Sequence, residues 1–240
     1  MSIGSLVTAL AFVIGAAVLF LAARRRGMAS EGMAYVVLAG LAGGVLGAKL
    51  TEWVVSQGGL LAANPGAIAD PRLGGRTLIG GVIFGWAAVE VAKWRLGIRR
   101  STGDLFALAL PAGEAVGRIG CFLNGCCYGV PTHVPWAVYQ HGALRHPTQL
   151  YSSAVALGTF VLLWVIRDRL PRPGDLFRLY LVLFGVSRFG LEFLREREHL
   201  IAALSLAQWT CLELAVVGAV GLALSFRRVS SAPPLVGSGG

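Results

Sequence analysis

Charged residues are scarce in this sequence. Lysine, arginine, aspartate and glutamate make up 14% of its 240 residues, whereas soluble domains carry roughly 25%. The scarcity excludes an ordinary soluble domain, and the apolar stretches lack the period-two alternation of a transmembrane β-barrel. The first apolar run, residues 3–23, also lacks a basic segment before it, and three arginines follow it instead. That order is the reverse of a secretory signal peptide, so we expect an uncleaved first span.

Long apolar runs are what the sequence has in abundance. Seven of them are long enough to cross a bilayer, which takes about 18 residues or more. They cover residues 3–23, 32–56, 77–98, 103–123, 148–167, 175–194 and 205–226. The predicted fold is an all-α membrane protein with seven transmembrane helices, its N-terminus outside and its C-terminus cytoplasmic. Residues 1–229 form a single membrane domain in this prediction, and residues 230–240 form a disordered tail.

The net charge of +9 fits this topology and does not require a nucleic-acid partner. With the N-terminus outside, 13 of the 21 lysines and arginines fall on the cytoplasmic side and 8 on the outer side. Positive residues in short cytoplasmic loops are the usual signal of membrane orientation.

Several charged residues lie inside the apolar runs, where topology does not explain them. Glu114 and Arg118 are four apart in the fourth span, and Arg188 and Glu192 are four apart in the sixth. Each pair therefore shares one helical face. Ionisable groups in a span are a functional hypothesis by default. Because a guanidinium group binds phosphate through two parallel hydrogen bonds, we expect Arg118 and Arg188 to bind an anion, for which a phospholipid phosphate is the abundant candidate.

Other polar positions support a site near the outer end of the spans. Lys49 and Glu52 share a face of the second span, and Arg76 begins the third. The segment "RHPTQLY", residues 145–151, opens the fifth span with His146 and Gln149 at its start. The N-terminus of a helix attracts anions, and a neutral histidine there is either a general base or a capping residue.

Three cysteines follow the fourth span. Cys121, Cys126 and Cys127 are spaced C-x4-C-C, which matches no familiar zinc ligand pattern. Four interpretations stay open: small packing thiols, a disulfide, metal binding together with His133, His141 or His146, and a thiol that carries lipid covalently. We predict no metal and no cofactor.

Four motifs together resemble those of the prolipoprotein diacylglyceryl transferase family. "GRIGCFLNGCCYG", residues 117–129, is similar to the family signature G-R-x-G-N-F-x-N-G-E-x-x-G. "RHPTQLY" is similar to H-P-[ST]-Q-L-Y, "SRFGLEFLRE" to R-F-x-x-E-F-x-R, and "GAKL" to G-[AG]-R-L. The resemblance implies a seven-span enzyme of the bacterial inner membrane whose active site lies near the outer, periplasmic face.

The resemblance also implies a reaction and its residues. The diacylglyceryl group of phosphatidylglycerol, a membrane lipid, is transferred to the lipobox cysteine in the signal peptide of a preprolipoprotein, and glycerol phosphate leaves. Arg118 matches the arginine that binds the lipid phosphate, and Asn124 and Gly129 match the signature. We predict catalytic roles for Arg188, Glu192 and His146. The predicted substrate-binding residues are Arg118, Asn124, Gly129, Arg76, Glu114 and Gln149.

The sequence departs from the family pattern at several places. Cys121 stands where the family has asparagine, Cys126 where it has glutamate, and Gly75-Arg76-Thr77 where it has H-G-G. An Arg-Trp-Tyr-Gly segment is absent as well. The same reaction, another acceptor, and a non-enzymatic lipid-binding protein or transporter therefore stay open. A thiol oxidoreductase is disfavoured because the sequence has no C-x-x-C.

Overall fold

The computed structural model describes residues 2–28, 31–56, 78–170, 172–195 and 200–230. All seven predicted spans are present there as helices, with ends within four residues of the predicted bounds. The helices are α1 (Ile3–Arg25), α2 (Glu31–Ser56), α4 (Leu78–Arg95), α5 (Gly103–Leu123), α6 (Thr148–Ile166), α7 (Asp175–Glu192) and α8 (Leu206–Ser230). The chain divides into two compact units, Met1–Ala22 with Ser101–Gly240, and Ala23–Arg100. Of the predicted tail, residues 230–240, Ser230 is the last residue of α8, and residues 231–240 lie outside the described residues.

Five of these helices are long and apolar enough to cross a membrane. The crossing segments are Ile3–Arg25, Glu31–Thr51, Gly103–Leu123, Thr148–Ile166 and Leu206–Arg227. A helix of 23 residues extends about 35 Å at 1.5 Å per residue, and the hydrocarbon core of a bilayer is about 30 Å thick. Large apolar side chains such as Phe12, Leu157 and Val217 are exposed on these helices. The chain is therefore a helical membrane protein.

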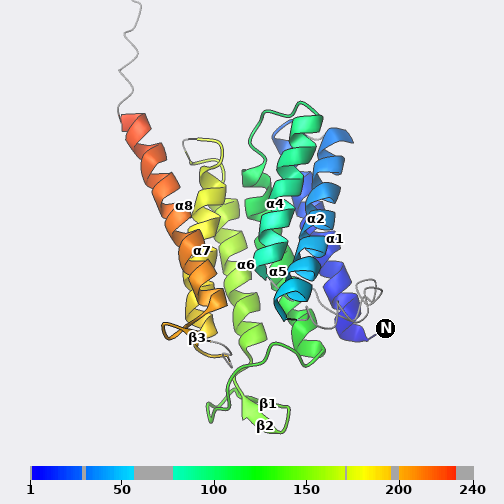
Figure 1. Cartoon of the computed structure of the whole chain (residues 1–240), viewed down its shortest axis with the longest axis vertical. Coiled ribbons are helices and arrows are strands. Elements are labelled where there is room, and N and C mark those ends of the chain that lie inside the picture. Colours follow the sequence, from blue (N-terminus) through cyan, green and yellow to red (C-terminus); the bar gives the residue numbers. More distant parts are fainter. Residues whose placement is uncertain (1, 29–30, 57–77, 171, 196–199, 231–240) are drawn as a thin grey trace, which may run out of the picture. The chain divides into compact units, whose positions relative to one another are not determined.

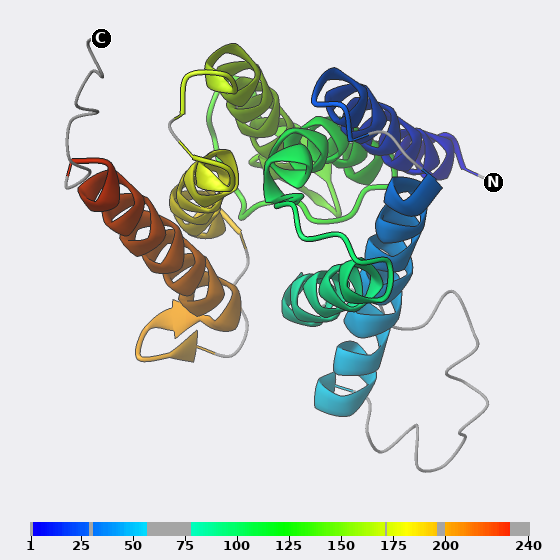
Figure 2. The same cartoon turned by 90° about the horizontal axis from the view of Figure 1, so that it is seen from above.

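The first unit packs α1, α5, α6, α7 and α8 lengthwise (Figure 1). Seen from above, α5 lies beside α6, and α7 lies between α6 and α8 (Figure 2). Close approach of α7 and α8 depends on Gly185, where an added Cβ would lie 2.5 Å from the carbonyl oxygen of Cys211. Between α5 and α6, the Ser153 hydroxyl donates to the carbonyl of Ala115 at 2.6 Å. Small residues at such contacts are typical of membrane helices.

One end of this unit is fixed by two buried aspartates. The Asp104 carboxylate on α5 accepts hydrogen bonds from the backbone N–H groups of Gly174 at 2.9 Å and Phe177 at 3.2 Å. These are unpaired donors at the start of α7, where a negative charge is favourable. Asp175 accepts a hydrogen bond from Ser225 on α8 at 2.9 Å and forms an ion pair with Arg178. Helices α5, α7 and α8 are thereby held together at this end.

The opposite end carries two short β-hairpins that the sequence analysis did not predict. Strands β1 (Val138–Gln140) and β2 (Ala143–Arg145) pair antiparallel, as do β3 (Leu200–Ile201) and β4 (Leu204–Ser205). The first turn consists of His141 and Gly142, both left-handed with φ of 48° and 79°. Two left-handed central residues are the geometry that two-residue hairpins favour.

The second unit is the pair α2 and α4. The glycine-rich face of α2 packs on α4, because an added Cβ at Gly47 would lie 2.3 Å from the Cβ of Phe84 and 2.5 Å from the carbonyl oxygen of Gly80. The small residues of α2 therefore form a helix-packing face.

Candidate functional site

The first part of the site is an ion pair on α5. Arg118 donates from Nε and Nη2 to Oε1 of Glu114, at 3.2 Å and 3.1 Å. The two residues share a face because they are four apart, and each side chain is 21% exposed. Glu114 thus orients one edge of the guanidinium group. Among the described residues, Nη1 has no hydrogen-bond partner, so this edge is available to an anion.

The second part is an ion pair on α7. Nη1 of Arg188 lies 2.7 Å from Oε2 of Glu192, and each side chain is 11% exposed. A buried charge is stable only when it is paired, and the four-residue spacing supplies that partner within one helix. The positive charges of Arg195 and Arg118 both act on the Arg188 guanidinium. The Arg118 and Arg188 guanidinium groups are therefore close enough for their charges to interact.

A small cleft lies among α5, α6 and α7, between the two ion pairs. Glu114 and Arg188 both line it, and its volume of about 20 Å³ is enough for one water molecule. Arg118 and Glu192 do not line the cleft, but each forms an ion pair with a residue that does. The cleft as it stands is too small for a lipid headgroup.

Polar cleft residues were missed by the sequence analysis. They are Ser152 and Thr159 on α6, and Tyr180 and Ser187 on α7. Tyr180, Phe184 and Arg188 are spaced four apart, so they follow the same face of α7. This spacing could have identified Tyr180, whose aromatic ring otherwise indicates an ordinary core residue.

The predicted signature residues Asn124 and Gly129 have contacts of a structural kind. Oδ1 of Asn124 accepts a hydrogen bond from the Ser2 hydroxyl at 2.8 Å, which attaches the end of α5 to the start of α1. An added Cβ at Gly129 would lie 2.6 Å from the carbonyl oxygen of Leu194 and 2.8 Å from Cβ of His146. Only glycine fits between these segments.

His146 lies beside the start of α6 and does not line the cleft. Its Nδ1 is 3.3 Å from the hydroxyl of Tyr151, whose oxygen accepts a hydrogen bond from Nε1 of Trp136 at 2.6 Å. Tyr151 fixes the orientation of the imidazole ring. When Nδ1–H donates to the Tyr151 oxygen, Nε2 is left as an acceptor, which is the arrangement that a general base requires.

Gln149 is buried at the same end of the unit. Its Nε2 donates to the carbonyl of Cys126 at 2.7 Å and to Oε1 of Gln140 at 3.2 Å. Its own Oε1 is buried without a hydrogen-bond partner in the described part of the chain. A buried acceptor without a partner is costly, and it marks a position where a donor group of a ligand would bind favourably.

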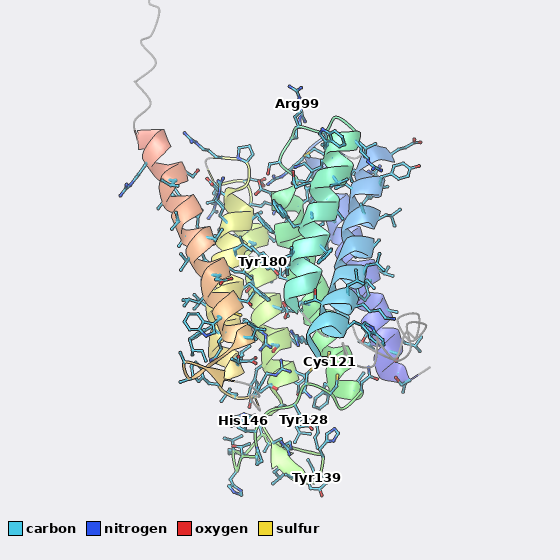
Figure 3. All side chains as sticks on the ribbon, viewed as in Figure 1. Arg99, Cys121, Tyr128, Tyr139, His146 and Tyr180 are labelled. Atoms are coloured by element: carbon cyan, nitrogen blue, oxygen red, sulfur yellow. The ribbon has the colours of Figure 1, made fainter. Side chains whose placement is uncertain are left out.

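The three cysteines form a cluster at the end of α5. Figure 3 places Cys121, Tyr128 and His146 at the end of the unit that carries the β1–β2 hairpin, whereas Tyr180 lies midway along the helices. The Sγ atoms of Cys121, Cys126 and Cys127 all lie within 4.8 Å of one another. Cys127 has a left-handed backbone with φ of 60°, which costs about 1–2 kcal/mol in a residue other than glycine.

The thiols of this cluster are not equivalent. A hydrogen bond from the Cys121 thiol lowers the pKa of the Cys127 thiol to about 5, and the charges of Arg195 and Arg118 act in the same direction, against the effect of burial. Burial raises the pKa of the Cys126 thiol. The hydrogen bond from Cys121 and the nearby arginine charges therefore favour loss of the proton from Cys127.

Two sets of predicted residues are not placed relative to this arrangement. Arg76 lies outside the described residues. Lys49 and Glu52 belong to α2 and hence to the second unit, whereas the cleft and the cysteine cluster are built from the first unit alone.

Comparison with known proteins identifies the family of the chain. The sequence model of the family described as "Prolipoprotein diacylglyceryl transferase" matches residues 3–224. The chain is 37% identical over 225 residues to a phosphatidylglycerol–prolipoprotein diacylglyceryl transferase from Aromatoleum aromaticum, covering 85% of this chain and 83% of that protein. Proteins of the same name from Cupriavidus metallidurans (32% identity; 86% of this chain and 80% of that protein) and Clostridium tetani (34%; 81% of each) are also similar. The chain belongs to the prolipoprotein diacylglyceryl transferase family.

Proposed function

We propose that the chain transfers the diacylglyceryl group of phosphatidylglycerol to a cysteine thiol of a prolipoprotein. The observation that carries this proposal is the pair of partly buried arginines, Arg118 on α5 and Arg188 on α7. Each forms an ion pair with a carboxylate on its own helix, and one member of each ion pair lines the same cleft. Relatives at 32% to 37% identity carry the name of this activity. A pair of oriented guanidinium groups is the chemistry that a lipid phosphate requires.

In the proposed reaction, the arginines stabilise the leaving group. The acceptor sulfur forms a bond to the glycerol carbon of the diacylglyceryl group while the bond from that carbon to the phosphate oxygen breaks. The phosphate gains negative charge as glycerol phosphate leaves. Because Arg118 is already held by Glu114, its free edge meets this charge without reorganisation, and stabilisation increases toward the transition state.

The acceptor thiol must lose its proton before it attacks. We assign the proton acceptor to His146, whose ring is oriented by Tyr151. Glu192 neutralises Arg188 in the free protein, and a bound phosphate would compete for that arginine. The buried Oε1 of Gln149 would accept a hydrogen bond from a hydroxyl or backbone N–H group of the substrates.

The proposal includes the topology. Seven spans, an outer N-terminus and a cytoplasmic C-terminus place the end of α5, the start of α6 and the end of α7 at the periplasmic face of the bacterial inner membrane. The signal peptide of a translocated preprolipoprotein and the outer-leaflet phospholipid both reach that face. The domain assignment, one membrane domain that ends with α8 at Ser230 and a disordered tail after it, belongs to the same proposal.

A cellular experiment tests the proposed function. The chain is expressed in bacteria depleted of their own diacylglyceryl transferase, and the N-terminus of a reporter lipoprotein is analysed by mass spectrometry. The wild-type chain should restore the diacylglyceryl modification, and the Arg118→Ala variant should not. A wild-type chain that inserts into the membrane but leaves the reporter unmodified would contradict the proposal and favour another acceptor.

A further inference from the structure

The three sulfur atoms at the end of α5 have the arrangement of a metal site. Cys121 belongs to the last turn of α5, while Cys126 and Cys127 follow in the next turn, yet all three Sγ atoms lie within 4.8 Å of one another. Three thiolates around one zinc ion at 2.3 Å would be about 3.8 Å apart in tetrahedral geometry. The cluster needs to contract by at most about 1 Å to reach that geometry.

The backbone is folded in a way that brings the sulfur atoms together. Gly125 and Cys127 are both left-handed, with φ of 64° and 60°, and they reverse the chain on either side of Cys126. The N–H of Cys126 donates to the carbonyl of Cys121 at 3.1 Å. A strained conformation at a residue other than glycine is most often retained at a functional position.

The start of α6 holds the other side of this turn. The carbonyl of Cys126 accepts a hydrogen bond from Gln149 at 2.7 Å, and the carbonyl of Cys127 accepts one from the Thr148 hydroxyl at 2.9 Å. These contacts hold the backbone of the turn in place, and the Cys126 thiol donates a hydrogen bond to the carbonyl of Cys121 at 3.6 Å. All three of these cysteines are free.

The charge around the cluster suits a metal with three thiolates. A Zn²⁺ ion with three thiolate ligands has a net charge of −1. The positive charges of Arg195 and Arg118 act on the Cys127 sulfur and offset that charge. Cys126 is exposed, whereas Cys121 and Cys127 are half-buried, so the cluster is open on one side.

We propose that Cys121, Cys126 and Cys127 bind one zinc ion, and that its open fourth position binds the acceptor thiol as a thiolate. Catalytic zinc sites have three protein ligands and one position for water or substrate. Zinc deprotonates a coordinated thiol. This inference rests on the proposed function, because the acceptor is the prolipoprotein cysteine. It also gives a role to the two cysteines that stand where the family signature has asparagine and glutamate.

The step is balanced without any oxidant or reductant. The acceptor thiol replaces water on zinc, and its proton passes to the base, for which His146 is proposed. The zinc-bound sulfur forms the bond to the glycerol carbon, and the electron pair of the breaking carbon–oxygen bond leaves with glycerol phosphate. The thioether product is a weaker zinc ligand than the thiolate, so it dissociates and water returns.

Metal content is the first test. Wild-type protein purified under reducing conditions should contain about one zinc per chain by inductively coupled plasma mass spectrometry. After stripping with a chelator, it should take up one equivalent of Zn²⁺ in competition with a chromophoric chelator. The triple variant Cys121→Ser/Cys126→Ser/Cys127→Ser should lose this zinc, whereas Cys211→Ala, the matched control on α8, should retain it.

Two results of this experiment would overturn the zinc site. One is a triple variant that binds zinc as tightly as the wild type. The other is wild-type protein that binds no zinc or contains a disulfide between two of the three cysteines. Should the triple variant fold poorly, the single variant Cys126→Ser changes only the exposed ligand, and its zinc affinity should fall at least tenfold.

The fourth ligand is tested by X-ray absorption at the zinc edge. Three sulfur ligands should be observed for the protein alone and four after addition of a lipobox peptide, whereas a peptide with serine in place of cysteine should leave three. A count of three with both peptides would refute the role of zinc in acceptor binding. Neither measurement requires lipid transfer, so failure of the proposed activity and failure of the zinc site are distinguishable.

Discussion

Replacement of Arg118 by lysine separates charge from geometry at the proposed phosphate site. In the wild-type structure Nε and Nη2 of Arg118 both donate to Oε1 of Glu114, at 3.2 Å and 3.1 Å. The Nη1 group is then held in a fixed position with its hydrogen atoms available to a phosphate. A lysine keeps the positive charge but has a single ammonium group, which cannot bind the glutamate along one edge and the phosphate along the other.

We expect Arg118→Lys to insert and fold as the wild type does but to lose turnover by on the order of 10²-fold. That loss equals about 2.7 kcal/mol at 1.36 kcal/mol per tenfold change, which matches the removal of one preorganised donor to a developing oxyanion. The loss should fall on kcat more than on KM, because the interaction strengthens in the transition state.

The assay is diacylglyceryl transfer to a lipobox peptide by purified variants in phosphatidylglycerol micelles. Arg178→Lys is the matched control, since Arg178 is also paired with a carboxylate on its own helix but lies at the opposite end of α7. The control should keep wild-type turnover. If Arg118→Lys also transfers lipid at the wild-type rate, Arg118 has only a structural role and the reasoning fails.

Three further variants test the parts of the site separately. Gly129→Ala should destabilise the protein by about 1–3 kcal/mol through overpacking, because its Cβ would meet a carbonyl oxygen at 2.6 Å. Thermal unfolding should show this loss of stability. The control Gly158→Ala, where an added Cβ has open space, should keep wild-type stability. Glu192→Gln should cost about 3–5 kcal/mol by leaving Arg188 buried and unpaired, and adding Arg188→Gln should restore thermal stability but not lipid transfer. Tyr151→Phe should lower kcat about tenfold, because it removes roughly one hydrogen bond that orients the base. In a His146→Ala background the same change should have no further effect on kcat. An additional loss there would show that Tyr151 acts independently of His146.

The helices and the ion pairs were predictable from sequence because they depend on local spacing. The apolar runs predicted both ends of α5 as the structure has them, and the ends of α6 to within one residue. The pairs Glu114–Arg118 and Arg188–Glu192 followed from the four-residue periodicity of a helix. Local spacing was enough because both partners of each pair lie on the same helix.

Features that depend on loop conformation were not predictable in the same way. The β1–β2 hairpin depends on a left-handed His141–Gly142 turn, and that dipeptide is a weaker signal than Asn-Gly. The spacing C-x4-C-C left a disulfide and a metal site open among other interpretations, because the convergence of the sulfur atoms depends on the left-handed conformations of Gly125 and Cys127. Tyr180 was missed because an aromatic residue in an apolar helix usually belongs to the core.

The central claim, transfer of a diacylglyceryl group to a thiol, is tested most directly by mass spectrometry of the products. Purified protein is incubated with phosphatidylglycerol that carries an isotope label in its diacylglyceryl moiety and with a lipobox peptide. The account predicts a peptide whose mass increases by the labelled diacylglyceryl group on its cysteine, together with an equal amount of unlabelled glycerol phosphate. A correctly folded protein that leaves the peptide unmodified and releases no glycerol phosphate would contradict it.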